Sequence, residues 1–404
     1  MKRLFRIAGS TLMLSLFPML SWLMLGIVLD SNLINVFSLS YPIQFLFLVL
    51  LSIFATGANI KQIKEKNENA ILSGLTIGIF AGLITLILFI VFTDRYIAFM
   101  GMDPLTYRVF TIYSFVSIFI RYVFQMILEN MYFEDRDKEA YRHSLVFNIL
   151  NFVILISVSL ITNNSIIIIS ITLFSILIYV VVLLIKTYRK FHIDFNLLSN
   201  IKYESVGIVT WLLLFLTYFI GFGNAFNAGP EYINAINFVT LITDTQWDCS
   251  EAISTVAKID IANGNYNFKK TMKNSFIFSL ILVATSLVAY CALFSIYEVN
   301  FGLGLLCLSV DLIDFMYNPI GYGFEPYVQL EYSSSKNTII AMISFGVRFL
   351  LSSFLPTAFC TQIGQIVAST LIIVLLLIIK VKHFKTTPSG TLERKSKKEE
   401  GILL

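Results

Sequence analysis

Five carboxylate side chains lie in apolar stretches of this sequence. Asp244, Asp248 and Glu251 are spaced by four and three residues, and Asp311 and Asp314 are three apart. Both spacings place side chains on one face of an α-helix. Like charges held close in a low-dielectric medium cannot all ionise, so we expect these acids to couple ions and bind substrate. The ion would be either H⁺ or Na⁺, and a Na⁺ ion would sit at Asp244 or Asp311 with hard oxygen ligands.

Two arginines also lie in apolar stretches. Arg348 could pair with one of the acids and simply hold helices together, but one guanidinium cannot neutralise five carboxylates. Arg348 is therefore kept among the residues that could line a cavity. Arg121 is expected to extend toward the polar end of its helix or to meet Glu129 rather than to bind substrate.

Two asparagines could add amide groups to a buried site. Asn318 follows Asp314 by one helical turn, and the next residue, Pro319, could break the helix and free a backbone carbonyl. Asn148 lies on one face with Asn151 and could either line a cavity or hydrogen-bond between helices.

The composition explains why such buried charges carry information. The chain is 57% hydrophobic and 13% charged, with a mean hydropathy of +0.80. These values exclude disordered, fibrous and ordinary soluble proteins and indicate a membrane protein. The net charge of +4 is small and no nucleic-acid motif is present, so no nucleic-acid partner is expected. The four cysteines lack CxxC spacing, which favours packing roles over metal or disulfide roles.

The apolar runs, some of which hold the acids and arginines named above, are long enough to predict twelve membrane-spanning helices, because each crossing needs about 20 apolar residues. The first run, although preceded by Lys2, Arg3 and Arg6, is too long for the apolar part of a signal peptide. The runs cover residues 7–29, 31–60, 71–93, 109–128, two within 144–185 divided by a turn at 163–165, 205–230, 232–257, 274–297, 299–323, and two within 337–379 divided near 356–362.

Charge asymmetry orients this set of spans. If both termini are cytoplasmic, the outer connections hold only Arg95 and Arg108 of the 29 Lys and Arg residues. Nearly all the other basic residues then lie on the inner side, as the positive-inside rule requires. The prediction is a multi-pass protein of the cell membrane whose basic tail contacts anionic lipid headgroups. On this count, Asp244 is roughly 18 Å deep and close to the bilayer midplane.

A spacing near 198 residues relates the inner connections of the two halves. The loop at residues 67–70 falls opposite 265–268, and 134–138 falls opposite 332–336. Repeats of this kind are typical of transporters. We therefore predict an all-α polytopic fold of two pseudo-symmetric six-helix bundles. The expected divisions are 1–190 for the first bundle, 191–204 for a cytoplasmic linker, 205–380 for the second bundle and 381–404 for the tail.

Three stretches carry a family resemblance. These are Tyr-Pro-Ile-Gln-Phe-Leu at 41–46, Thr-Gly-Ala-Asn at 56–59 with the loop at 64–70, and residues 132–151. Together they resemble the second helix, its following loop and the fourth-to-fifth helix region of the multidrug and toxic compound extrusion (MATE) family. The resemblance implies a V-shaped pair of bundles around a central cavity, and export of amphipathic, often cationic compounds driven by H⁺ or Na⁺. It also places Tyr41 and Gln44 in the cavity.

The sequence departs from that family in its first span, where residues 7–29 hold no acidic residue. This departure favours an alternative, a lipid or lipid-linked oligosaccharide flippase of the same superfamily, in which the buried arginines would hold an anionic headgroup. An intramembrane aspartyl protease is disfavoured because no GxGD-like motif surrounds Asp244 or Asp311. An ATP-driven pump is disfavoured because no GxxxxGK[ST] motif is present.

The preferred interpretation is therefore a monomeric secondary antiporter and not an enzyme. Its expected partners are a small organic substrate, H⁺ or Na⁺, and membrane lipid. No cofactor is expected.

Overall fold

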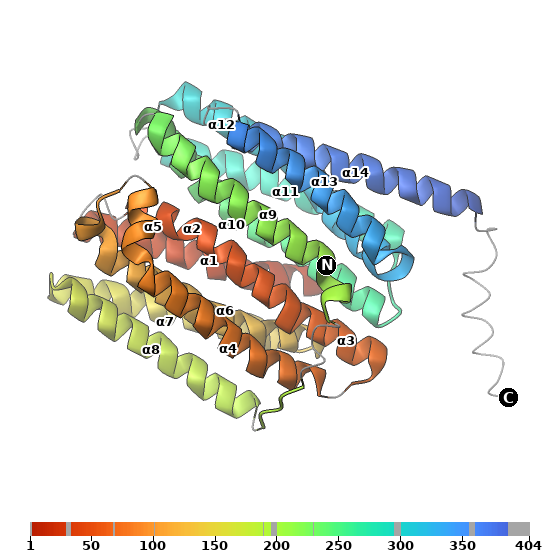
Figure 1. The fold of residues 1–404 in the computed structure, drawn as a ribbon, viewed down its shortest axis with the longest axis horizontal. Coiled ribbons are helices and arrows are strands. Elements are labelled where there is room, and N and C mark those ends of the chain that lie inside the picture. Colours follow the sequence, from red (N-terminus) through yellow and green to blue (C-terminus); the bar gives the residue numbers. More distant parts are fainter. Residues whose placement is uncertain are drawn as a thin grey trace.

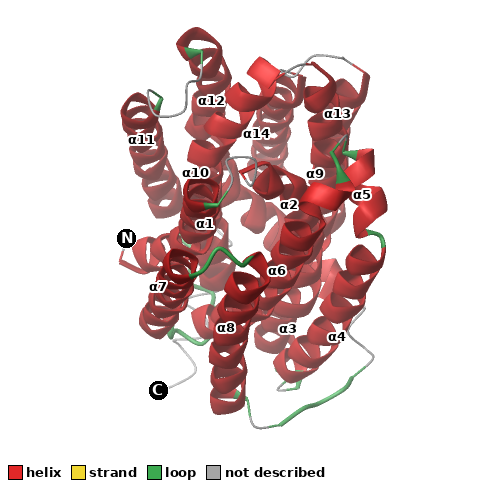
Figure 2. Ribbon diagram, turned by 90° about the vertical axis from the view of Figure 1, so that its left-hand side faces the viewer, coloured by secondary structure: helices red, strands yellow, loops and turns green. Residues whose placement is uncertain are grey.

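The structure is a computed structural model that describes residues 2–29, 34–67, 69–100, 102–188, 190–194, 200–228, 230–294, 300–354 and 360–386. This part of the chain is built from helices, as Figure 2 shows. Two π-helical turns are η2 (Ser52–Thr56) and η4 (Val328–Tyr332). The α-helices are α1 (Lys2–Val28), α2 (Ile34–Leu51), α3 (Gly57–Glu65), α4 (Ala70–Val91), α5 (Thr93–Phe99), α6 (Pro104–Phe133), α7 (Asp137–Ile161), α8 (Ser165–Thr187), α9 (Ile201–Ala228), α10 (Pro230–Ala262), α11 (Phe268–Leu293), α12 (Phe301–Tyr327), α13 (Ser334–Phe354) and α14 (Cys360–Thr386).

Each of the twelve predicted spans coincides with a helix. Within the described ranges, 9 helical stretches are long and apolar enough to cross a membrane. The acid-bearing α10, α13, and α14 with its apolar part Ile366–Ile379 account for the other three predicted spans. The second span is a continuous rod formed by α2, η2 and α3, and α5 is a short additional helix between the third and fourth spans.

The polar breaks between helices are explained by local caps. Asn164 lies in the predicted turn at 163–165 and caps α8, because its side chain accepts hydrogen bonds from the backbone N–H groups of Ile166 and Ile167. Asp103 caps α6 in the same way. Hydrogen bonds from the Thr106 hydroxyl and from the backbone N–H groups of Leu105 and Thr106 hold the pKa of Asp103 below its usual value.

Two of the predicted helix breaks, at Pro319 and near 356–362, are not confirmed by the structure. Pro319 does not interrupt its helix, because α12 continues through Pro319 and Pro326 to Tyr327. The predicted carbonyl-freeing break at Pro319 is therefore wrong, since neighbouring helices can accommodate a proline within a long transmembrane helix. The predicted division near 356–362 falls mostly on residues 355–359, which lie outside the described residues.

The helices form two groups with matching internal contacts. In Figure 1, α1–α8 occupy the lower part of the molecule and α9–α14 the upper part. In the first group α1 packs on α7 and α2 on α6, and in the second group α9 packs on α13 and α10 on α12. The groups meet through α1 against α10 and through α2 against α9. Helices α1 and α2 of the first group correspond to α9 and α10 of the second. Each therefore contacts the partner of its own counterpart, which is the pattern expected for pseudo-two-fold symmetry.

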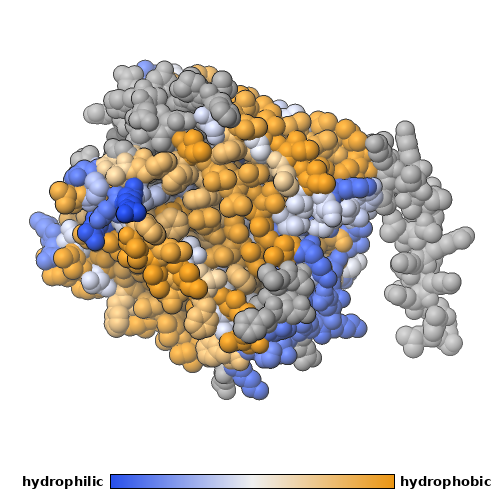
Figure 3. All heavy atoms as spheres, viewed as in Figure 1, coloured by the Kyte–Doolittle hydropathy of each residue, from blue (hydrophilic) through white to orange (hydrophobic). Residues whose placement is uncertain are grey.

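The surface also fits a membrane protein. Figure 3 shows apolar side chains across the middle of one face, with polar side chains gathered toward its ends. Large aliphatic side chains stand exposed along single helices, among them Ile84 and Val91 of α4 and Ile166 and Ile185 of α8. An apolar surface of this extent is unusual on a soluble monomer and is suited to hydrocarbon.

Close packing of α4 on η2 gives a first prediction. A Cβ atom on Gly74 would collide with the Phe54 carbonyl oxygen and lie 2.8 Å from the Ala58 Cβ atom. We expect Gly74→Ala to lower stability by about 1–3 kcal/mol, because backbone must move to admit the methyl group. Gly346→Ala is the matched control, since no atom lies within 4 Å of that position. Thermal unfolding in detergent measures both, and equal midpoints would contradict the packing of α4 on η2.

Candidate functional site

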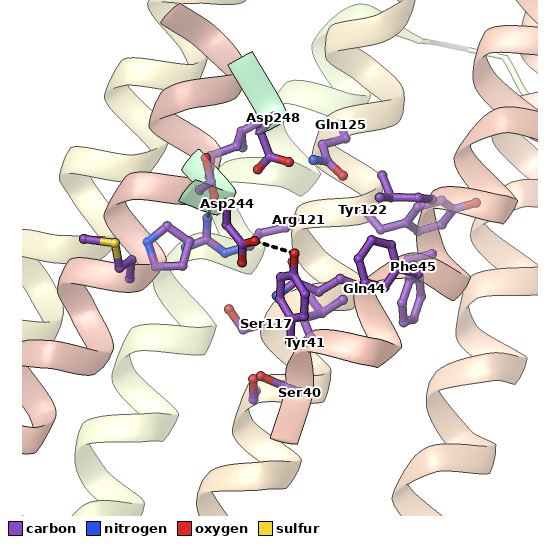
Figure 4. Close-up of a pocket in the computed structure, with 18 of the residues that line it drawn as sticks. Ser40, Tyr41, Gln44, Phe45, Ser117, Arg121, Tyr122, Gln125, Asp244 and Asp248 are labelled. Carbon is purple, nitrogen blue, oxygen red and sulfur yellow. Dashed lines mark hydrogen bonds between the residues drawn. The ribbon is translucent and has the colours of Figure 1, made fainter. Parts of the chain in front are cut away.

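A central cavity lies between α1, α2, α6 and α10 (Figure 4). It encloses about 1020 Å³, including the open space at its mouth. Three of the four helices belong to the first group and one to the second. The cavity is lined by aromatic and aliphatic side chains together with a few polar and charged groups: Leu14, Ser15, Pro18, Met19, Trp22, Ser40, Tyr41, Gln44, Phe45, Phe47, Leu48, Ser114, Ser117, Ile118, Arg121, Tyr122, Gln125, Asp244, Thr245 and Asp248. This mixture is typical of sites for small organic molecules.

Asp244 and Asp248 are the carboxylates that α10 contributes to the cavity. Their spacing of four residues places both on the face of α10 that packs against α1. Asp244 is 8% exposed, and Asp248 is partly exposed. Both carboxylates therefore line the cavity and do not lie on the lipid-facing surface.

Tyr41 joins Asp244 across the interface between the two helix groups. The Tyr41 hydroxyl on α2 donates a hydrogen bond of 2.5 Å to Oδ1 of Asp244 on α10. Figure 4 shows this contact at the cavity wall. The Tyr41 ring also packs edge-on against Phe45 and against Tyr218 of α9, with ring centroids 5.2 Å and 5.1 Å away. A carboxylate that accepts a short hydrogen bond from the other group can couple its charge to the arrangement of the groups.

Arg121 lies in the cavity wall, contrary to the sequence-based expectation. Its Nη1 atom on α6 donates to the Leu14 carbonyl at 3.1 Å and to Oδ1 of Asn148 at 3.0 Å. Its guanidinium carbon lies 5.7 Å from the centroid of the Phe147 ring. Extension toward the helix end or toward Glu129 was the wrong interpretation, because acceptors on α1 and α7 hold the side chain inside the bundle.

The other predicted first-bundle residues have different environments. Gln44 lines the cavity beside Tyr41 (Figure 4). Asn148 is fully buried, donates to the Ser144 carbonyl and accepts from Arg121, so it links helices and orients Arg121 behind the wall. Of the two roles left open for Asn148, the structure places it in the inter-helix one.

Asp311 and Asp314 form a separate buried pair on α12. Asp311 is 5% exposed and faces the Thr243 hydroxyl on α10, whereas Asp314 is fully buried and accepts a hydrogen bond from Nδ2 of Asn318 at 3.3 Å. Neither aspartate lines the central cavity. Because α12 packs against α10, this pair lies behind the cavity acids and not among them.

Arg348 contacts Tyr218 of α9. Its Nη2 atom donates to the Tyr218 hydroxyl at 3.1 Å, and its guanidinium carbon lies 5.3 Å from the centre of that ring. Asp311 is within its electrostatic reach. Arg348 therefore belongs to a chain of contacts that runs through Tyr218 and Tyr41 to Asp244, and it does not line the central cavity.

A second cavity of about 860 Å³, including its open mouth, holds Glu251, the third acid of α10. Leu48 lines both cavities. Glu129 of α6 and Glu325 of α12 line the second cavity with Glu251 and Lys258, and Asn318 lies in its wall. The five predicted acids are thus divided among three neighbouring environments.

Lys258 supplies a cation to this second cavity, although it follows the predicted span 232–257. It lies on α10 with its side chain 16% exposed and forms an ion pair with Glu204 of α9, with Nζ 2.8 Å from Oε1. The Glu204 side chain is 1% exposed. Sequence reasoning missed this pair because both residues stand at the ends of apolar runs, where charges are normally solvated.

No metal site is evident within the described residues, where no group of three or more His, Cys, Asp and Glu side chains could hold a metal ion. Cys249 and Cys307 are buried as expected, whereas Cys291 is exposed on α11. The side chain of Cys360 lies outside the described residues.

Comparisons with known proteins identify the fold. No family model and no curated protein sequence matches the chain. Among solved structures, MATE in complex with MaD3S is 15% identical and has a TM-score of 0.69, with 96% of this chain and 97% of that chain covered. The eukaryotic MATE transporter AtDTX14 is 16% identical with a TM-score of 0.68, covering 98% of each chain.

A third structure, the outward-facing conformation of a multidrug resistance MATE family transporter of the MOP superfamily, is 15% identical with a TM-score of 0.67 and covers 96% of this chain and 97% of that chain. The described part of the chain thus has an all-α, multi-pass membrane fold, in which twelve helical spans form two pseudo-symmetric bundles, as predicted. Its fold is that of the MATE transporters, which the sequence resemblance implied.

Proposed function

We propose that this protein is a secondary active transporter that exports small organic compounds across the cytoplasmic membrane in exchange for H⁺ or Na⁺. The observation that carries the proposal is the Tyr41–Asp244 hydrogen bond, which connects the two bundles at the wall of a cavity whose mixed aromatic and polar lining is typical of sites for small organic molecules. The MATE fold of the chain supports it. The proposed orientation places both termini in the cytoplasm.

Ion exchange would act through the charge of Asp244 and Asp248. An ionised Asp244 attracts a cationic group of the compound and accepts a strong bond from Tyr41. A proton or Na⁺ arriving at these carboxylates removes the attraction, so the compound is released. The same event weakens the Tyr41 contact between bundles, which gives the ion a different affinity for the two arrangements of the bundles.

Bundle movement requires contacts that can be broken at little cost. At the proposed cytoplasmic end, Lys64 of α3 contacts Glu331 of η4 at 3.4 Å, and Lys202 of α9 contacts Glu65 of α3 at 2.8 Å. All four side chains are substantially exposed, so each pair contributes only about 0–1 kcal/mol. An inward ion supplies about 2.3 kcal/mol per charge for each 100 mV of membrane potential, which exceeds this cost.

The test uses purified protein in proteoliposomes with an imposed H⁺ or Na⁺ gradient and a fluorescent organic cation. Uphill movement of the dye that collapses when the gradient is dissipated is the expected result. Absence of movement under both gradients would overturn the antiport proposal.

A lipid or lipid-linked oligosaccharide flippase is the second candidate function. The cavity position of Arg121 favours it, because a guanidinium can hold a phosphate headgroup. Loss of labelled lipid from the accessible leaflet of the same vesicles, without any gradient-driven dye movement, would identify this activity instead.

A further inference from the structure

The central cavity offers charges of both signs on separate walls. Arg121 projects from α6, and Asp244 and Asp248 project from α10 (Figure 4). Among the described residues Arg121 makes no ion pair within 4.0 Å, so no carboxylate neutralises its charge by direct contact. A cation held in the membrane without an acidic partner is costly, which makes a ligand partner worth seeking.

The hydrogen bonds of Arg121 leave most of its donor groups for a ligand. Within the described residues, its hydrogen bonds to Leu14 and Asn148 both start from Nη1. Of the five N–H groups of a guanidinium, those on Nη2 and Nε are therefore left to face the cavity that Arg121 lines. Asn148 and the Phe147 ring fix the guanidinium plane, which reduces the entropy lost when a planar oxyanion binds.

The aspartates provide the complementary half of the site. Asp244 and Asp248 suit an amine or other cationic group, and the rings of Trp22, Tyr41 and Phe45 suit an apolar body between the two charges. The cavity therefore presents one guanidinium on α6 and two carboxylates on α10 to a ligand. We propose that the preferred substrate is an amphipathic zwitterion whose carboxylate binds Arg121 and whose cationic group binds Asp244 or Asp248. This inference rests on the proposed transport function and narrows its substrate class from cation to zwitterion.

Equilibrium binding of two matched dyes tests it. One probe is a xanthylium dye with a free benzoate, and the other is the methyl ester of the same dye, which keeps the cation and lacks the carboxylate. Fluorescence anisotropy with purified wild-type protein should show tighter binding of the free acid, by about tenfold or more. Arg121→Gln should abolish that preference while leaving the ester within about twofold, and Arg121→Lys should keep part of it because the charge remains. Arg108→Gln, which alters an exposed arginine paired with Asp94, should preserve it.

The comparison of the two dyes on wild-type protein needs no variant. A folding defect in Arg121→Gln therefore cannot obscure whether the free acid binds more tightly. Equal or tighter binding of the ester by wild type would overturn the inference and leave the transport proposal standing if the ester is moved by a gradient. Binding of neither dye, with no gradient-driven movement, would overturn both. Displacement of the free-acid dye by short-chain phosphatidylethanolamine would support oxyanion recognition by Arg121 and would identify a lipid headgroup as its source.

Discussion

Asp244→Asn is expected to reduce gradient-driven export by about 10- to 100-fold while the protein folds normally. The substitution keeps the size and polarity of the side chain but removes the negative charge that faces the cavity. Losing a charge-assisted contact typically costs 1.5–3 kcal/mol, which sets this range. The Tyr41 hydroxyl can still donate to the amide oxygen, so the bundles remain joined in a neutral state.

Proteoliposome transport of an organic cation measures this effect, with size-exclusion behaviour in detergent as the check on folding. Asp94→Asn is the matched control because Asp94 lies on α5 in an exposed pair with Arg108. Tyr41→Phe should give a smaller loss than Asp244→Asn, since it removes the hydroxyl but preserves the carboxylate. Transport by Asp244→Asn at the wild-type rate would show that this carboxylate is not part of the exchange.

Lys258→Met is expected to be the most destabilising single change. Lys258 is the ion-pair partner of Glu204, whose side chain is 1% exposed. Removing the cation leaves a carboxylate buried without its partner, and breaking a buried pair in this way costs about 3–5 kcal/mol. We expect a low yield of folded protein and a markedly lower unfolding midpoint in detergent.

The double variant Lys258→Met with Glu204→Gln separates this mechanism from a general packing defect. Neutralising both partners removes the uncompensated charge, so the double variant should recover most of the lost stability. If the double variant were as unstable as Lys258→Met alone, the charge of Glu204 would not be the cause.

The spans could be predicted from the sequence because their cause is local. A membrane crossing needs a long uncharged run, and residues 144–185 could be divided correctly because Asn164 is both a turn former and a helix cap. The short α5 was not predicted because it lies in the connection between the third and fourth spans, where a loop was expected. Pro319 misled because a proline signals a break only where no neighbouring helix compensates.

The acids of the candidate site could also be found from sequence, since charges are conspicuous in apolar runs. Their grouping could not be found in the same way. Helical spacing places Asp244, Asp248 and Glu251 on one face of α10, but which helix covers each turn of that face depends on tertiary packing. The structure puts Asp248 in the central cavity and Glu251 in the second one, with Leu48 between the two cavities.

Arg121 illustrates the same limit for a single residue. Its depth on α6 is compatible with extension toward the headgroups, and that preference is general for isolated helices. The acceptors that hold it are the Leu14 carbonyl of α1 and the Asn148 side chain of α7, which are far away in sequence. Only the assembled bundle brings them together.

The central claim is that the α10 carboxylates exchange an inorganic ion for an organic compound. Proton release on binding tests it most directly, in weakly buffered detergent solution with a pH indicator and the cationic methyl ester dye. We expect dye binding to release protons, or Na⁺ to weaken dye binding, and Asp244→Asn to abolish the effect. Tight dye binding that releases no proton and is indifferent to Na⁺ would contradict the account.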